Sequence, residues 1–281
     1  MRNFDLCVAY RVYPGICKPV FMFQNNKLKL AQFAFKSFVN ALGKVKTKLY
    51  IILDTCPNEY KDTFLRIYPD AEIIEGVHLG NPGSFEMQMN LLLEQNFSDL
   101  VYFAEDDYFY LPDSIEISLD FYRKHKPHFL TLYYHPDYLN WEIHNISAPK
   151  GIAFENRFWQ RIGSTTLTFL TSKKILDETK NVFLSFKKKN NDCSLWFSLT
   201  KTNIFKPAFY KLAFNPKRNW FYAKMIAKMW WFNAWQSLFG NEYSLYAPFP
   251  SLATHMERDS LAPNVRWNEL FQYYQKLWQI E

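Results

Sequence analysis

The stretch VYFAEDDYFY, from Val101 to Tyr110, carries the strongest indication of the fold. Its apolar run ends at Ala104, and three consecutive acids, Glu105, Asp106 and Asp107, follow before aromatic residues resume. A short apolar run with polar residues at its end is typical of a buried strand. Because neighbouring carboxylates repel one another, three acids beside a buried strand need a partner that offsets their charge.

Strand-like and helix-like segments alternate before this stretch. In chain order they are residues 4–14 (strand), 27–43 (helix), 48–54 (strand), 57–69 (helix), 71–78 (strand) and 85–96 (helix). Residues 80–84 are expected to form a turn, with Ser84 as the N-cap of the helix that follows. Such alternation favours an α/β fold with a doubly wound, mostly parallel sheet and helices on both faces.

The remainder of the chain predicts further elements and a second region. We expect a helix over 113–126, a strand over 129–134, irregular structure to about residue 161, a strand over 165–171 and then a helix. The hydrophobic content of 48% over 281 residues allows a sizeable core. We predict a catalytic domain over residues 1–204, with residues 205–281 as an aromatic-rich, basic, helical extension packed on it.

The charge of the chain is unevenly distributed. The formal net charge is +6, and between Lys173 and Lys228 there are 13 Lys or Arg residues but 3 Asp or Glu residues. This excess predicts an anionic partner: a nucleotide diphosphate, an anionic acceptor or a membrane surface. Nucleic acid is not the expected partner, because the basic residues alternate with aromatic residues of core type and no known module is present.

The expected cellular location rests on the cysteines, the first residues of the chain and the apolar segments. The four cysteines are scattered, which favours reduced thiols, and the first residues lack the pattern of a signal peptide. No stretch of ~18 uncharged apolar residues predicts a transmembrane helix. A cytoplasmic location is expected. The segment from Asn219 to Phe239 leaves two alternatives open: a helix packed on the catalytic domain, or peripheral contact with an anionic membrane at its cytoplasmic face.

The acids after the fourth strand stand where open α/β sheets bind ligands, beyond the carboxyl ends of the strands. Side chains alternate along a strand, which predicts Glu105 and Asp107 on one side and Asp106 on the other. Carboxylate oxygens suit a hard cation such as Mn²⁺ or Mg²⁺, which can grip a diphosphate. The alternative is an acidic strand end that caps the following turn.

Several motifs together resemble one family of enzymes. They are VAYRVYP (8–14), IILD (51–54), GNPGSFEMQMNLLLE (80–94), FAEDD (103–107), GSTTLTFLTSKKIL (163–176), NNDCSLW (190–196) and PSLATHMERDS (250–260). In these motifs the chain resembles the GT-A glycosyltransferases, broadly their large family-2-like group. The resemblance covers roughly residues 4–200 and a segment near residue 250. Glu-Asp-Asp stands here in place of the family's Asp-X-Asp motif.

The resemblance implies a transfer of a sugar from a nucleotide diphosphate sugar to a glycan or lipid-linked glycan. The donor is expected to be a UDP-sugar, with a GDP-sugar as the alternative. A divalent cation, Mn²⁺ or Mg²⁺, is expected at Asp107, Glu105 and His255. Asp192 is the expected general base of an inverting displacement. The predicted donor-binding residues are Tyr10, Arg11, Asp54, Gly83 and Asp106.

Each of these residues also has a structural interpretation. Asp192 fits the N-cap of the helix that follows it, Asp54 fits a strand-end acid beside a turn, and His255 fits a structural histidine. Glu105 fits either direct contact with the metal or contact through water. At the level of function, two alternatives remain: a non-catalytic protein that binds glycans or membrane surfaces, and a sugar nucleotidyltransferase. The latter class usually has a glycine-rich basic loop after its first strand, which AYRVYPGICK does not supply.

Overall fold

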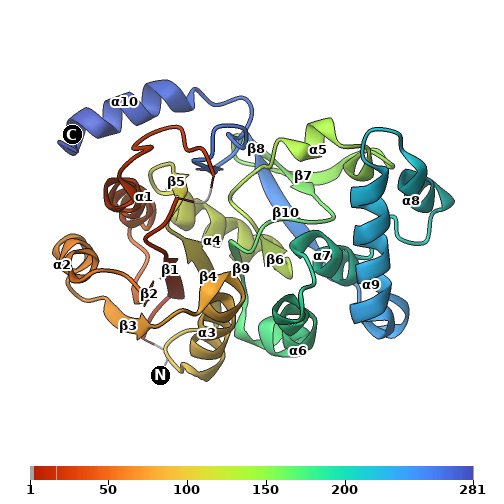
Figure 1. The fold of residues 1–281 in the computed structure, drawn as a ribbon, viewed down its shortest axis with the longest axis horizontal. Coiled ribbons are helices and arrows are strands. Elements are labelled where there is room, and N and C mark those ends of the chain that lie inside the picture. The colour runs from red at the N-terminus through yellow and green to blue at the C-terminus, as the bar shows by residue number, and fades with distance from the viewer. Residues whose placement is uncertain (1–2, 17, 281) are drawn as a thin grey trace.

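The computed structural model describes residues 3–16 and 18–280 of the chain. The described residues form a layered α/β fold around a nine-stranded sheet in the order β3-β2-β1-β4-β9-β6-β10-β8-β7 (Figure 1). Its strands are β1 (Leu6–Val12), β2 (Thr47–Asp54), β3 (Glu72–Gly76), β4 (Leu100–Glu105), β6 (Phe129–Leu130), β7 (Lys150–Phe154), β8 (Arg157–Arg161), β9 (Phe169–Ser172) and β10 (Leu245–Phe249). A separate small sheet pairs β5 (Tyr108–Tyr110) with β11 (Ala253–His255).

The half of the sheet nearest the N-terminus is parallel, as predicted. β1 lies between β2 and β4 and runs parallel to both, and β3 adds a further parallel strand beyond β2. Alternate β1 residues enter opposite cores: Val8 belongs to one hydrophobic cluster, and Cys7 and Ala9 belong to the other. Burial on both faces explains why these strands appear in the sequence as continuous apolar runs.

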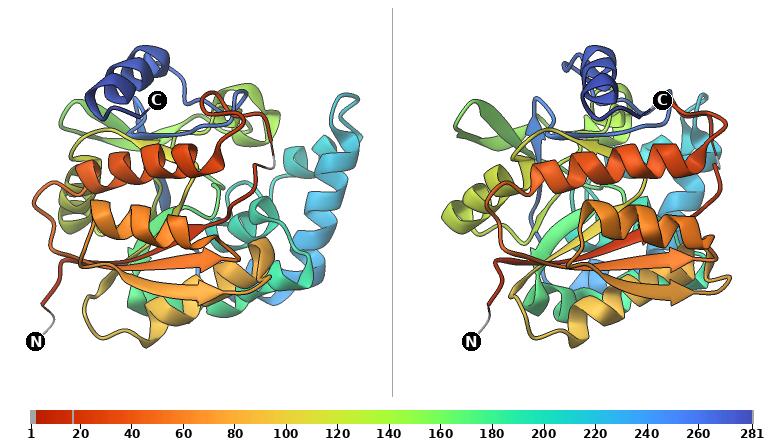
Figure 2. Two further views of the ribbon diagram at one scale, coloured as in Figure 1. Left: turned by 60° about the vertical axis from the view of Figure 1, so that its left-hand side comes forward. Right: turned by 90° about the vertical axis from the view of Figure 1, so that its left-hand side faces the viewer.

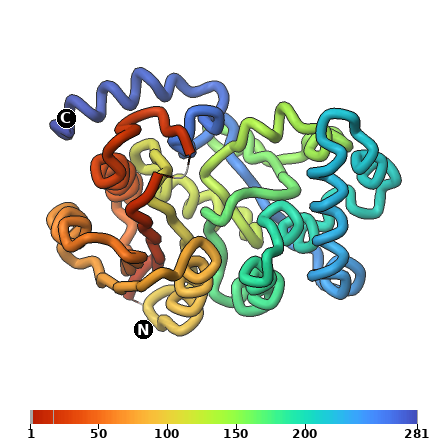
Figure 3. The backbone as a smooth tube through the Cα atoms, in the orientation of Figure 1, coloured from red at the N-terminus to blue at the C-terminus, as the bar shows by residue number. Residues whose placement is uncertain are grey.

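Helices cover both faces of the sheet. One face carries α1 (Lys27–Ala41), α2 (Asn58–Ile67), α4 (Ser114–His125) and α10 (Trp267–Leu277), and the other carries α3 (Gly80–Glu94), α6 (Lys173–Leu184) and α7 (Asp192–Thr200). Figure 3 shows the C-terminal α10 returning to the first helix, where its Phe271 and the following Trp278 pack on Phe33 of α1. The C-terminal helix therefore covers part of the hydrophobic core that contains α1.

The region beyond the predicted boundary at residue 204 is not a purely helical extension. It contains α8 (Pro207–Lys211), the long α9 (Asn219–Phe239) and β10. β10 enters the main sheet between β6 and β8, parallel to β6 and antiparallel to β8. The prediction of a separate helical region was wrong in this respect, because the sheet is completed by a strand from the C-terminal part. Figure 2 shows α9 at the edge of the molecule.

Several predicted segments differ in the structure, and the strand predicted over 165–171 begins only at Phe169. The strand predicted over 129–134 ends at Leu130, and the region expected to be irregular contains α5 (Asp137–Asn140), the 3₁₀ turn η1 (Glu142–His144) and the hairpin β7–β8. The expected turn over 80–84 is the first turn of α3, so Ser84 is inside the helix and is not its N-cap. Further 3₁₀ turns are η2 (Ser185–Lys188) and η3 (Leu212–Phe214).

The early start of α3 has a physical cause in the neighbouring strand. The carboxylate of Asp54, at the end of β2, accepts the backbone N–H groups of Leu79 (2.9 Å) and Gly80 (2.8 Å). These bonds satisfy donors at the start of a helix that have no partner inside it. Gly80 has a φ of 61°, a backbone conformation that glycine adopts without strain.

The structure also shows the state of the cysteines and the character of the helices. Cys7, Cys56 and Cys193 are free thiols, and Cys17 lies outside the described residues. Within residues 3–16 and 18–280, no helix has both the length and the apolar character needed to cross a bilayer.

The position of β10 generates a prediction about stability. Leu245 on β10 is fully buried in the core that β4, β9 and α7 share. Leu245→Ala removes buried methyl groups and should lower the free energy of unfolding by about 2–5 kcal/mol, measured by urea denaturation. Leu277→Ala at an exposed position of α10 is the matched control and should change it little. Equal effects of the two substitutions would show that β10 does not contribute to the core.

Candidate functional site

A cavity of about 550 Å³ opens at the carboxyl ends of β1, β2 and β4. Its polar lining comes from distant parts of the chain and consists of Arg11, Lys18, Lys27, Asp54, Asn81, Ser84, Glu105, Asp106, Asp107, Thr166, Asp192, His255 and Glu257. This is the edge of an α/β sheet at which ligands bind. The parallel arrangement of β1, β2 and β4 brings Arg11, Asp54 and Glu105 together, and other elements supply the remaining residues.

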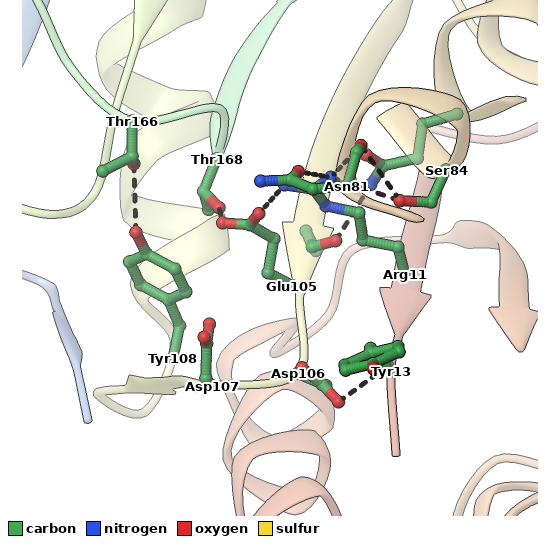
Figure 4. A network of polar contacts seen from close by, with 12 residues as sticks. Arg11, Tyr13, Asn81, Ser84, Glu105, Asp106, Asp107, Tyr108, Thr166 and Thr168 are labelled. Atoms are coloured by element: carbon green, nitrogen blue, oxygen red, sulfur yellow. Dashed lines mark hydrogen bonds and ion pairs between the residues drawn. The ribbon is translucent and has the colours of Figure 1, made fainter. Parts of the chain in front are cut away.

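The three consecutive acids all line this cavity, but each carboxylate has a different partner. Figure 4 draws the contacts of Glu105 and the contact of Asp106 with Tyr13. β4 ends at Glu105, and Asp106 and Asp107 form the turn into β5. The alternation of a strand therefore stops at Glu105. Figure 4 shows the Asp106 carboxylate pointing toward Tyr13 and away from those of Glu105 and Asp107, as expected, although all three acids border the same cavity.

Glu105 is held by an arginine and a threonine. One carboxylate oxygen accepts a hydrogen bond from the Arg11 guanidinium in a buried ion pair, and the other accepts the Thr168 hydroxyl at 2.7 Å. Arg11 also donates to the Asn81 carbonyl (3.0 Å) and to the Ser84 hydroxyl (3.3 Å). Burial lowers the pKa of Arg11 to about 10, so the guanidinium stays charged at neutral pH. Each oxygen of Glu105 thus already accepts one hydrogen bond, and direct contact of Glu105 with a metal stays a prediction.

Asp106 forms a second buried ion pair at the start of the first helix. Its Oδ1 lies 2.9 Å from the Lys27 ammonium, and its Oδ2 accepts the Tyr13 backbone N–H at 3.2 Å. Burial raises the pKa of Asp106, while the charge of Lys27 and these hydrogen bonds oppose that shift. Lys27 was not among the predicted site residues, since nothing in the sequence relates the first turn of α1 to an acid 79 residues away.

Asp107 is paired with the predicted histidine. Its Oδ2 lies 3.3 Å from Nε2 of His255, which β11 places opposite Tyr108 of β5. Although burial alone would raise it, the pKa of Asp107 is held below its ordinary value by His255. Burial would in turn lower the pKa of His255, but the carboxylate of Asp107 raises it above the ordinary value. The Glu257 backbone N–H donates to Nδ1 of His255 (3.2 Å), which orients the ring.

The other oxygen of Asp107 is the feature that a metal ion fits. Asp107 Oδ1 is buried and has no hydrogen-bond partner among the described residues. A buried oxygen without a partner is costly, and a bound cation removes that cost. Within the described part of the chain, no three His, Cys, Asp or Glu side chains form a preassembled metal cluster. Mg²⁺ sites often use one or two carboxylates together with substrate phosphates and water, and Asp107 fits that pattern.

Two predicted donor-binding residues do not reach the cavity. Tyr10 is fully buried, and its ring packs on Phe35 and Phe38 with centroids 5.1 and 5.3 Å apart. Its prediction as a stacking partner was wrong because Tyr10 points into the core, while Arg11, its neighbour on β1, lines the cavity. Gly83 lies inside α3, and Gly80, Asn81 and Ser84 line the cavity in its place.

Asp54 lines the cavity but has a structural task. Besides the two helix N–H groups, its carboxylate accepts the Thr55 hydroxyl at 3.1 Å. These bonds agree with the interpretation of Asp54 as a strand-end acid. Contact of Asp54 with a nucleoside stays a prediction.

Asp192 lines two cavities. The N-cap of α7 is Asn191, whose side chain accepts the Ser194 N–H at 2.8 Å, so the interpretation of Asp192 as the N-cap was wrong. Asp192 contributes to the cavity of about 550 Å³ and also to a smaller cavity of about 100 Å³. Burial raises the pKa of its carboxyl group, and the Cys193 N–H at 2.8 Å opposes the shift. A raised pKa suits a group that must accept a proton.

The smaller cavity combines aromatic and polar side chains. Its lining includes His135, Asp137, Tyr138, Trp141, His144 and Phe221. Burial lowers the pKa of His135 to about 4 and that of His144 to about 3, so both rings are neutral near pH 7. Neutral imidazoles, a carboxylate and aromatic faces suit an uncharged, hydroxyl-rich ligand.

Comparison with solved structures gives weak likenesses to two kinds of enzyme. No protein-family model and no curated protein sequence matches the chain. The structure of S. aureus TarS 1–349 in complex with UDP matches at 10% identity and a TM-score of 0.45, over 69% of this chain and 54% of that one. A cytidylyltransferase from Leptospira borgpetersenii matches at 8% identity and a TM-score of 0.35, over 63% and 64% of the two chains. This chain therefore spans about half of the TarS fragment, and TM-scores below 0.5 assign it to no family.

The ion pair of Arg11 with Glu105 leads to a prediction about stability. Arg11→Met leaves the Glu105 carboxylate buried without its cation, which should lower the free energy of unfolding by about 3–5 kcal/mol. The double variant Arg11→Met/Glu105→Gln should recover part of this loss, because no uncompensated charge remains. Urea denaturation measures these two variants and the single variant Glu105→Gln, with Arg66→Met at an exposed position as the control. A loss in the double variant as large as the sum of the two single losses would show that the pair is not coupled.

Proposed function

We propose that this protein is a glycosyltransferase that moves a sugar from a nucleotide diphosphate sugar to a glycan or lipid-linked glycan. The observation that carries the proposal is the position of Asp192, which lines both the acidic cavity at the sheet edge and the smaller aromatic cavity. A transferase needs a donor site and an acceptor site with a base between them. The two cavities and Asp192 provide these three parts.

The charge balance of the larger cavity supports a cation-dependent donor site. Among the described residues that line it, six are Asp or Glu and three are Lys or Arg. A diphosphate is itself anionic, so such a lining repels it unless a further cation is present. Asp107 would hold that cation, as Mn²⁺ or Mg²⁺, and His255 would join it as a ligand on losing the proton that it shares with Asp107. The bound ion would neutralise the charge of the leaving diphosphate.

The residues of the chain have separate tasks in the proposed reaction. An acceptor hydroxyl in the smaller cavity attacks the anomeric carbon of the donor, and Asp192 takes the proton of that hydroxyl. The bond from the anomeric carbon to the phosphate oxygen breaks, and its electron pair leaves with the nucleoside diphosphate. A single displacement of this kind inverts the anomeric centre. Arg11 and Lys27, each paired with an acid of the triplet, orient Glu105 and Asp106 at the rim of the donor site.

The proposal is tested with a panel of nucleotide sugars. The protein is incubated with UDP-sugars and GDP-sugars, with and without Mn²⁺ or Mg²⁺, and release of the nucleoside diphosphate is measured. Release from one donor, with UDP-sugars preferred, is the expected result. Pyrophosphate release from a nucleoside triphosphate and a sugar phosphate would indicate a nucleotidyltransferase instead. Binding of glycans without turnover of any donor would indicate a non-catalytic protein.

A first prediction concerns the cation. Asp107→Asn removes the charge of the proposed metal ligand and should lower the rate of transfer at least about 100-fold. Removal of divalent ions with EDTA should have a similar effect, and added Mn²⁺ should restore the wild type. Asp120→Asn, at an exposed position of α4, is the matched control. Full activity of Asp107→Asn in EDTA would refute the cation but leave the transferase proposal standing.

A second prediction concerns the base and pH. Asp192 accepts a proton only when ionised, and burial raises its pKa above the ordinary value of 3.8. The transfer rate should therefore fall as pH is lowered through a midpoint above 3.8. Asp192→Asn should reduce the rate by about 10²–10⁴ and abolish this dependence, while donor affinity measured by calorimetry stays the same. Asp177→Asn, exposed on α6, should behave as wild type. An unchanged pH profile in Asp192→Asn excludes Asp192 as the base.

A further inference from the structure

The long helix α9 exposes large aromatic side chains. The exposed fractions are 77% for Trp220, 83% for Trp231 and 76% for Trp235. Phe239 at the end of the helix and Phe214 just before it are also exposed. Single exposed apolar side chains are normal on a monomer, whereas a contiguous group of them marks an interaction surface. We name these five residues, with the lysines on the same helix, the α9 surface.

The opposite side of α9 is anchored in the protein. Tyr222, Met225 and Met229 are fully buried in a cluster that includes Phe197 of α7. Positions 220, 224, 227 and 231 are three or four residues apart, so they follow one another along the exposed side of the helix. The helix has a kink at Asn233, and Trp235 and Phe239 lie beyond that kink. In the left view of Figure 2, α9 stands at the edge of the molecule, and Figure 1 shows α8 beside it. The α9 surface therefore faces the outside, and the buried side fixes the helix to the protein.

A shallow groove of about 480 Å³ lies on this surface. Its lining is largely apolar, with Trp220, Ala227 and Trp231 among its walls, and Lys224 and Lys228 are its charged members. An apolar groove flanked by ammonium groups fits a partner with an apolar part beside an anionic part.

The charges around the α9 surface have one sign. From Lys201 to Gly240 the sequence has seven Lys or Arg residues and no Asp or Glu. Lys206, Lys211, Lys217 and Lys224 are exposed. A second copy of the chain would bring two such positive regions together and be repelled, whereas an anionic surface is attracted.

We propose that the α9 surface docks the protein on the surface of an anionic lipid membrane. Tryptophan and phenylalanine enter the boundary between headgroups and acyl chains, and lysines contact the anionic headgroups. α9 lies in the plane of the interface and does not cross it. Phe221 of the same helix lines the smaller cavity, so docking brings the membrane next to the proposed acceptor site. Only this last point rests on the proposed function, since membrane binding needs no donor and no catalysis.

Vesicle flotation tests the proposal with the full chain and without nucleotide sugar. The protein should float with vesicles of phosphatidylcholine mixed with phosphatidylglycerol, far less with phosphatidylcholine alone, and less at high salt. Lys224→Gln/Lys228→Gln should lower the partition coefficient about 30-fold. Trp231→Ser/Trp235→Ser should abolish flotation.

Matched variants at exposed sites outside the α9 surface serve as controls. They are Lys44→Gln/Lys46→Gln for charge and Tyr273→Ser/Leu277→Ser for apolar area, and both should float as wild type. Any one of three results would overturn the proposal. The wild type does not float, it binds both vesicle types equally, or the tryptophan variant binds as well as the wild type. A concentration-dependent dimer in light scattering that Trp231→Ser/Trp235→Ser abolishes would assign the surface to a second copy. Donor turnover is measured separately, so its failure does not affect this result.

Discussion

The buried ion pair between Arg11 and Glu105 is the interaction on which the arrangement of the site depends. The two residues are directly opposite one another in the register of β1 and β4, at the carboxyl ends of both strands. Arg11 reaches beyond Glu105 to Asn81 and Ser84 in the first turns of α3. One guanidinium therefore connects two strands and a helix at the rim of the cavity, and its fork of donors allows this where a single ammonium would not.

The other two acids of the triplet are also paired with side chains from distant parts of the chain. Asp106 is bound to Lys27 at the start of α1, and Asp107 is bound to His255, which comes from β11 near the end of the chain. Segments distant in sequence thus meet at three adjacent carboxylates, and each pairing reduces the repulsion among them. What remains is an oxygen of Asp107 without a hydrogen-bond partner among the described residues. The site is stabilised by its ion pairs, yet it keeps a group available for a ligand.

The two sides of α9 differ in burial and in charge. Its buried side adds Met225 and Met229 to a core, while its outer side places tryptophan in water and carries positive charge without carboxylates. Such a side is unfavourable for an isolated protein and favourable at an interface between apolar and anionic matter. The helix can expose the α9 surface without loss of stability, because its opposite side packs in the core.

The sequence by itself determined the parallel half of the sheet and the place of the acidic triplet, because continuous apolar runs and their spacing are local properties. It also identified His255 beside Asp107 through a resemblance. Only the tertiary structure showed that Asp106 pairs with Lys27 and Glu105 with Arg11. It also showed that Tyr10 lies in the core and not in the cavity. It also inserted β10 into the sheet across the predicted boundary. These outcomes depend on contacts between residues many positions apart, and a local pattern contains no information about which distant side chain will fill a given space.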